Sequence, residues 1–154
     1  MSNAPIQNYY PEDVSYCFGC GHRNEYGHQL KTYWDGKKST ARFTPKEYHT
    51  ALPDYVYGGL IASLIDCHGT GTASAAMADK RGINPAADGA PRFVTASLQV
   101  DYKKPTPIGK ELYLTGQVRE ITDRKVIVTI QLNVDDTVCA EGTVVTVEMR
   151  NSKK

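Results

Sequence analysis

The feature that most constrains this chain is the stretch from Gly58 to Ala78, which contains no Lys or Arg and a single acidic residue, Asp66. Gly58 and Gly59 open the stretch, and bulky aliphatic residues recur at the three- and four-residue spacing of a helix. We therefore predict a buried helix from Gly58 to Asp79. A buried carboxylate without a cation nearby in sequence is either paired with a residue from elsewhere in the chain or functional.

The two faces of this predicted helix differ in size. One face is bulky and contains Leu60, Ile61, Leu64, Ile65 and His68; the other is small and contains Ala62, Ser63, Asp66, Gly69, Thr70 and Ala73. Glycine inside a helix costs about 1 kcal/mol relative to alanine, so Gly69 and Gly71 indicate that tertiary packing holds the helix. Lys80 and Arg81 followed by Gly82 are typical of a helix C-terminus.

Alternating apolar residues on either side of the helix predict about six strands. These cover residues 29–34 and 39–44, which form a hairpin, and then residues 94–102, 111–121, 125–134 and 138–149. In the strand 94–102 the alternation places Thr95 on the opposite face from Val100. Strands of about ten residues with one apolar face can curl around a single helix. The predicted fold class is α+β, with a long central helix wrapped by a curved, mainly antiparallel sheet.

Length and charge limit the possible classes of function. The chain has 154 residues and a formal net charge of +1, so we predict a single domain over 1–154 and no nucleic-acid partner. No apolar run reaches the roughly 18 residues that span a membrane. We interpret the polar residues 1–4 as a tag remnant and find no signal peptide, so we expect a cytoplasmic protein with four reduced cysteines. Residues 1–28 are predicted to be irregular and residues 151–154 to form a solvated tail.

Three motifs carry a resemblance to a known family. They are Gly58-Gly59 with Asp66 seven residues after Gly59, the segment from Asp101-Tyr102-Lys103-Lys104-Pro105 to Ile108-Gly109-Lys110-Glu111-Leu112, and Cys17-Phe18-Gly19-Cys20-Gly21. Together with the element order they resemble the PaaI-like acyl-CoA thioesterases, which have the hotdog fold. The resemblance extends over roughly residues 17–149. It implies an acyl-CoA substrate, a working acid at Asp66 and a homodimer.

The chain departs from this family pattern at two positions. The family helix begins His-Gly-Gly, and the histidine is replaced here by Tyr57. An asparagine that many members place six residues earlier falls at Ala51, beside His49 and Thr50. A polar residue that orients water in some members falls at Thr95, which keeps a hydroxyl. These departures bear on rate and substrate more than on fold.

The residues themselves indicate how a thioester could be hydrolysed. Backbone amides at the helix start, where Gly58 and Gly59 leave room for a carbonyl, can stabilise an oxyanion. Asp66 can act as general base or nucleophile. The seven residues between Gly59 and Asp66 span about 10 Å of helix, so both cannot contact one carbonyl carbon. An antiparallel two-fold dimer would bring them together from different subunits. A dimer of dimers is the larger assembly that such pairing allows.

Other interpretations of these residues stay open. Asp66 could be a helix-capping or ion-paired acid at a dimer contact. Gly58 and Gly59 could form a simple turn, and Tyr57 could be a half-buried packing residue or a donor to the thioester. His49, in a loop, is either a substitute for the missing asparagine or merely solvated. A hotdog dehydratase is disfavoured because it needs the absent histidine, whereas a non-catalytic acyl-CoA-binding or regulatory module is the alternative function.

Coenzyme A carries phosphates, so a basic rim is expected. The candidates are Lys103, Lys104, Arg124 and Lys125; surface cations are otherwise solubilising. The resemblance places nucleotide contacts at Arg124 and Lys125.

The Cys17-x-x-Cys20 motif raises the question of a metal site. His22, or the adjacent pair Cys67 and His68, could supply further ligands for zinc. A single Cys-x-x-Cys is a weak signal, so we interpret Cys17 and Cys20 as thiols in a glycine-rich turn and predict no metal and no cofactor.

Overall fold

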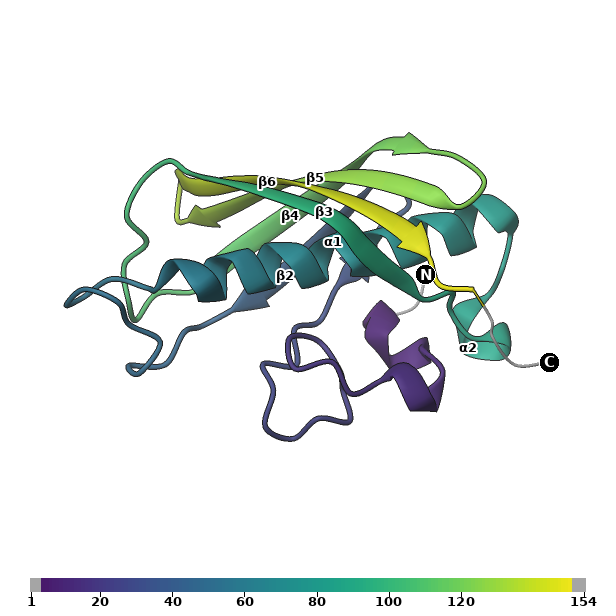
Figure 1. Cartoon of the computed structure of the whole chain (residues 1–154), viewed down its shortest axis with the longest axis horizontal. Coiled ribbons are helices and arrows are strands. Elements are labelled where there is room, and N and C mark those ends of the chain that lie inside the picture. Colours follow the sequence, from purple (N-terminus) through teal and green to yellow (C-terminus); the bar gives the residue numbers. More distant parts are fainter. Residues whose placement is uncertain (1–3, 151–154) are drawn as a thin grey trace.

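Helix α1 (Gly58–Arg81) lies across one face of a six-stranded antiparallel sheet, and the N-terminal segment covers the helix from the other side (Figure 1). This computed structural model describes residues 4–150. Residues 1–3 of the proposed tag remnant and the tail 151–154 lie outside the described residues. The arrangement confirms the predicted α+β hotdog class.

Helix α1 begins and ends where the sequence signals indicate. Tyr57, at the N-cap, has extended backbone angles of φ −75° and ψ 143°, and Gly82 adopts the left-handed φ of 69° that ends the helix. The observed helix continues two residues beyond the predicted end at Asp79. No helix in the described part of the chain, α1 included, is long and apolar enough to cross a membrane.

The sheet places the strands in an order that differs from their order in the chain. The strands are β1 (Tyr33–Trp34), β2 (Lys38–Phe43), β3 (Phe93–Tyr102), β4 (Leu112–Ile121), β5 (Lys125–Val134) and β6 (Thr137–Glu148). Their order across the sheet is β1-β2-β4-β5-β6-β3. Strand β3 therefore lies at an edge and pairs with β6 alone. Its other edge is open within the chain, next to α1 (Figure 1).

The predicted strand 29–34 is mostly wrong, because only β1 pairs within the sheet. Gln29 has a φ of 53°, which interrupts extended structure. Thr32 is fully buried and bonds the N-terminal segment instead: its amide donates to Gln7 Oε1 at 2.9 Å, and its carbonyl accepts from the Ile6 amide at 2.9 Å. The described part of the segment 1–28, which was predicted to be irregular, contains only two short helices, η1 (Ile6–Tyr9) and η2 (Glu12–Val14). A third short helix, α2 (Pro85–Asp88), follows α1.

The core lies between α1 and the sheet. Fully buried helix residues such as Leu64 and Ile65 pack with inward-facing residues of β4, β5 and β6. Gly69, predicted on the small outer face, instead faces the sheet: a Cβ there would lie 2.6 Å from Val144 of β6. Ala73 is likewise fully buried in the core. The small residues at these two positions thus let α1 approach β6 closely, and they are unavailable to a second subunit.

Candidate active site

Before its exposed last turn, Asp79 to Arg81, helix α1 is accessible only along a short stripe. Between Gly58 and Ala78 every residue is buried except Gly58, Gly59, Ala62, Ser63 and Asp66. Positions 59, 62 and 66 recur at helical spacing and share one side of the helix. The predicted acid and the predicted glycines thus lie on the part of the first five turns of this helix that a ligand can reach.

Asp66 and Thr95 meet across the gap between α1 and the edge strand β3. Thr95 Oγ1 donates a hydrogen bond to Asp66 Oδ1. The predicted alternation, which placed Thr95 on the face opposite Val100, is wrong because a β-bulge interrupts β3 between Thr95 and Ser97. The bulge returns Thr95 to the helix side, the side on which Phe93 and Val100 contact the core.

Within one chain, Asp66 neither caps the helix nor forms an ion pair among the described residues. It is the ninth residue of α1, too far from either end to act as a cap. Among the described residues, the ion pairs of this chain leave Asp66 out. Its side chain is partly exposed. A carboxylate held by one hydroxyl and open to solvent can accept a proton from water.

Two tyrosines flank the start of α1. The Tyr57 ring folds over Gly59 so closely that a Cβ on Gly59 would overlap the ring, yet 47% of Tyr57 remains exposed. The Tyr102 hydroxyl donates a hydrogen bond of 2.7 Å to the Gly58 carbonyl, and partial burial raises the pKa of Tyr102. No role for Tyr102 was predicted from the sequence. Its place at the end of a strand in one of the resemblance motifs was the signal available.

The first amides of α1 are available as hydrogen-bond donors. The N-terminal amides of an α-helix have no acceptor within the helix. In the described part of the chain no side chain caps this end, since Tyr57 makes no capping bond. Because the helix dipole adds partial positive charge there, the amides of Gly58 and Gly59 can donate hydrogen bonds to a developing oxyanion.

The loop before α1 holds His49 against other aromatic residues. Its Nδ1 accepts a 2.9 Å hydrogen bond from the Lys46 amide, and its ring lies 5.4 Å from His28 and 4.8 Å from Tyr48. Partial burial, followed by the charge of Lys46, lowers the pKa of His49. Its carbonyl accepts from the Tyr57 amide at 3.0 Å. His49 therefore supports the loop that leads into the helix, while Ala51 is exposed.

The structure brings three cysteine sulfurs together. Cys17 and Cys20 come from the N-terminal turn and Cys67 from α1, directly after Asp66. Hydrogen bonds from the Cys20 and Cys67 thiols hold the pKa of Cys17 well below its usual range, and the same contact raises the pKa of Cys20 to about 12. His68, considered with Cys67 as a ligand, faces elsewhere and bonds Thr32.

The four predicted coenzyme A cations lie at opposite ends of α1. Lys103 and Lys104 directly follow Tyr102, which contacts the helix start at Gly58. Arg124 and Lys125 form the β4–β5 turn, where the carbonyl of the neighbouring Asp123 accepts a hydrogen bond from Arg81 at the helix end. One chain therefore does not unite them into a single basic rim.

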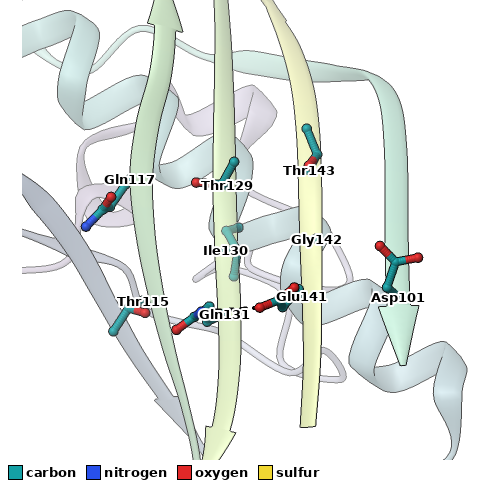
Figure 2. A pocket seen from close by; sticks show the side chains of 9 residues that line it. All are labelled: Asp101, Thr115, Gln117, Thr129, Ile130, Gln131, Glu141, Gly142 and Thr143. Carbon is teal, nitrogen blue, oxygen red and sulfur yellow. Dashed lines mark hydrogen bonds between the residues drawn. The ribbon is translucent and has the colours of Figure 1, made fainter. Parts of the chain in front are cut away.

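A separate hollow of about 360 Å³ lies on the outer face of the sheet (Figure 2). Polar residues of four strands surround it: Asp101, Thr115, Gln117, Thr129, Gln131, Glu141 and Thr143, with Ile130 and Gly142 at its base. Thr115 and Gln117 alternate with core residues of β4, so the hollow opens away from α1 and from Asp66. Two carboxylates and, among the described residues, no cation line it, which disfavours the phosphates of coenzyme A.

Comparison with known proteins decides the family. The model of the thioesterase superfamily matches residues 54–141, more than half of the chain. The chain belongs to the thioesterase superfamily. The match includes α1 with Asp66, the bulged strand β3 and the tyrosines at the helix start.

Members of the thioesterase superfamily also match the whole fold. A superfamily protein from Shewanella loihica PV-4 is 48% identical, with a TM-score of 0.68 over 90% of this chain and 97% of that one. The E. coli PaaI protein shares the fold at 15% identity, with a TM-score of 0.63 over 80% of this chain and 82% of that one. The resemblance to PaaI-like thioesterases is confirmed.

A curated relative has a named activity. The acyl-coenzyme A thioesterase THEM4 of Xenopus laevis is 30% identical over 100 residues, which is 65% of this chain. The match spans 39% of that protein's length.

Proposed function

We propose that this chain hydrolyses acyl-CoA thioesters to the free acid and coenzyme A. The observation that carries the proposal is the Asp66 carboxylate, which accepts a hydrogen bond from the Thr95 hydroxyl on an accessible stripe of a largely buried helix. Membership of the thioesterase superfamily and the name of the THEM4 relative support an acyl-CoA substrate.

The proposed reaction uses water, side chains and amides. Asp66 accepts a proton from a water molecule that Thr95 orients, and the water oxygen attacks the thioester carbon. The carbonyl oxygen becomes an oxyanion, which the amides at Gly58 and Gly59 stabilise. The carbon–sulfur bond then breaks, and the coenzyme A sulfur leaves with the proton held by Asp66. A direct attack by the Asp66 carboxylate, followed by hydrolysis of the anhydride, satisfies the same geometry.

The complete site requires two subunits. Gly59 and Asp66 lie about 10 Å apart along α1, so one chain cannot place both groups on one carbonyl. The accessible stripe of α1 lies beside the open edge of β3, where Val94 is 42% and Leu98 38% exposed. A long exposed edge strand with apolar side chains is a common site of pairing between chains. Antiparallel pairing would also place Lys103 of one subunit near the C-terminal end of α1 in the other subunit. Arg124 of that other subunit lies beside this helix end.

We expect a homodimer in solution, and a mixing experiment tests whether its sites are shared. Asp66→Asn and Gly59→Val each damage one half of the site, the second because a side chain at Gly59 collides with the Tyr57 ring. After subunit exchange, half of the dimers are mixed and have one intact site each, so roughly a quarter of wild-type activity should return. Sedimentation measures the mass. A monomer at micromolar concentration, or no recovery in mixed dimers, would contradict the shared site.

Hydrolysis itself is tested with a panel of short, long and aryl acyl-CoAs, by following release of free thiol. We expect turnover of at least one member. Saturable binding without thiol release from any member would instead support the alternative, a non-catalytic acyl-CoA-binding module. The Tyr57 ring over Gly59 gives that alternative a structural basis, because it narrows the approach to the helix amides.

A further inference from the structure

Three cysteines that have no role in the proposed hydrolysis lie close together where the N-terminal turn meets α1. Two come from the turn and one from the helix. The sulfurs of Cys17, Cys20 and Cys67 all lie within 4.8 Å of one another. The Cys17 and Cys67 sulfurs are 3.8 Å apart. Cys20 and Cys67 are 1% and 6% exposed, whereas Cys17 is partly exposed. All three are free thiols.

The separation of these sulfurs matches that of ligands around one metal ion. Zinc–sulfur bonds are about 2.3 Å long, and tetrahedral geometry then places the ligand sulfurs about 3.8 Å apart. A disulfide requires sulfurs about 2.05 Å apart. The observed 3.8 Å between Cys17 and Cys67 therefore fits a shared ion.

The turn that carries Cys17 and Cys20 is shaped to present sulfur. The Gly21 amide donates to the Cys17 carbonyl at 2.7 Å and closes the turn. The Gly19 amide donates to the Cys17 sulfur at 3.3 Å, a contact that favours the thiolate needed for metal binding. A Cβ on Gly19 would overlap the Cys67 sulfur, so glycine at this position is what allows the helix cysteine to reach the turn.

Histidine ligands do not complete this set. Both ring nitrogens of His68 are engaged, Nδ1 with Thr32 and Nε2 with Ser39, each at 2.9 Å. Among the described residues, the group close enough to share an ion contains three sulfurs and no histidine, so His22 is also outside it. The fourth position around an ion would be open on the side of Cys17, the partly exposed member.

We propose that Cys17, Cys20 and Cys67 form a three-thiolate site for Zn²⁺, with water or an external ligand in the fourth position. Binding replaces the thiol protons, which pass to solvent. The ion would tie the N-terminal turn to α1 next to Asp66. This role goes beyond hydrolysis, and it replaces the sequence-based expectation of no metal.

The test uses the full chain under a phosphine reductant, stripped of metal with a chelator that is then removed. Zn²⁺ is titrated in competition with a chromophoric chelator, and Co²⁺ serves as a spectroscopic substitute. We expect one ion per chain and a sulfur-to-cobalt charge-transfer band. Cys17→Ser and Cys67→Ser should weaken binding by more than the roughly 10- to 100-fold lost when an outer-shell partner is removed.

Cys139→Ser is the matched control, since Cys139 is also buried but contacts the Pro105 carbonyl at 3.8 Å, away from the three sulfurs. It should bind zinc as the wild type does. The cobalt spectrum of the wild type tests for thiolate ligands without any variant, so this test does not depend on whether Cys67→Ser folds. If the wild type binds no zinc at micromolar free ion, or if Cys17→Ser and Cys139→Ser bind equally, the proposal is wrong. Neither measurement involves an acyl-CoA.

Discussion

Replacing Asp66 with Asn is expected to lower kcat for acyl-CoA hydrolysis by about 10²- to 10⁴-fold, with a much smaller change in KM. The amide keeps the shape of the carboxylate and can still accept the hydrogen bond from Thr95, but it cannot take a proton from water. Asp66 is partly exposed, so the variant should fold. Thiol release under single-turnover conditions measures the chemical step, and circular dichroism measures the fold.

Two further variants determine whether the loss belongs to the site. Asp101→Asn makes the same chemical change on the outer face of the sheet (Figure 2) and should leave kcat unchanged. Thr95→Val removes the hydroxyl that donates a hydrogen bond to Asp66 and should lower kcat by roughly tenfold. A tenfold loss corresponds to a rise of about 1.4 kcal/mol in the activation free energy. Full activity in Asp66→Asn would show that Asp66 is not the catalytic acid.

The sequence predicted the site helix well because its signals are local. Uncharged residues around a single acid, glycines at the start and a basic pair before Gly82 all act within a few turns, and they gave both ends within two residues. The position of Thr95 was predicted on the wrong face because alternation assumes an uninterrupted strand. The bulge at Ser97 arises from pairing with β6, which lies more than forty residues further along the chain.

Long-range packing accounts for the other differences. Gly69 was placed on the small face of the helix by helical spacing, but the contact with Val144 depends on the course of β6. Cys67 could not be matched to Cys17 from spacing, since fifty residues separate them and the N-terminal turn folds back beneath α1. Residues 29–32 look like a strand but pair with the N-terminal segment. In each case a contact with residues distant in the sequence, rather than the local sequence pattern, determines where the residue lies.

Stability is expected to fall by about 2 kcal/mol between pH 7 and pH 5 through His68 alone. Burial of its ring among hydroxyls lowers the pKa of His68 from 6.5 to about 3. Between these values the unfolded chain binds a proton that the folded chain excludes, so the stability present above pH 6.5 is lost as the pH falls towards 3. Urea unfolding at fixed protein concentration, with a chelator present, measures this change without a contribution from metal release.

His68→Gln separates this effect from other titrations. Its amide can still reach the hydroxyls of Thr32 and Ser39, of which Ser39 also bonds the Thr72 hydroxyl at 2.6 Å. The variant should be less stable than wild type at pH 7, yet its stability should vary far less between pH 7 and pH 5. His49→Gln, near the surface, should retain most of the wild-type slope because its ring is less buried. Equal slopes in wild type and His68→Gln would mean that the folded and unfolded chains protonate His68 at the same pH, which the complete burial of its ring opposes.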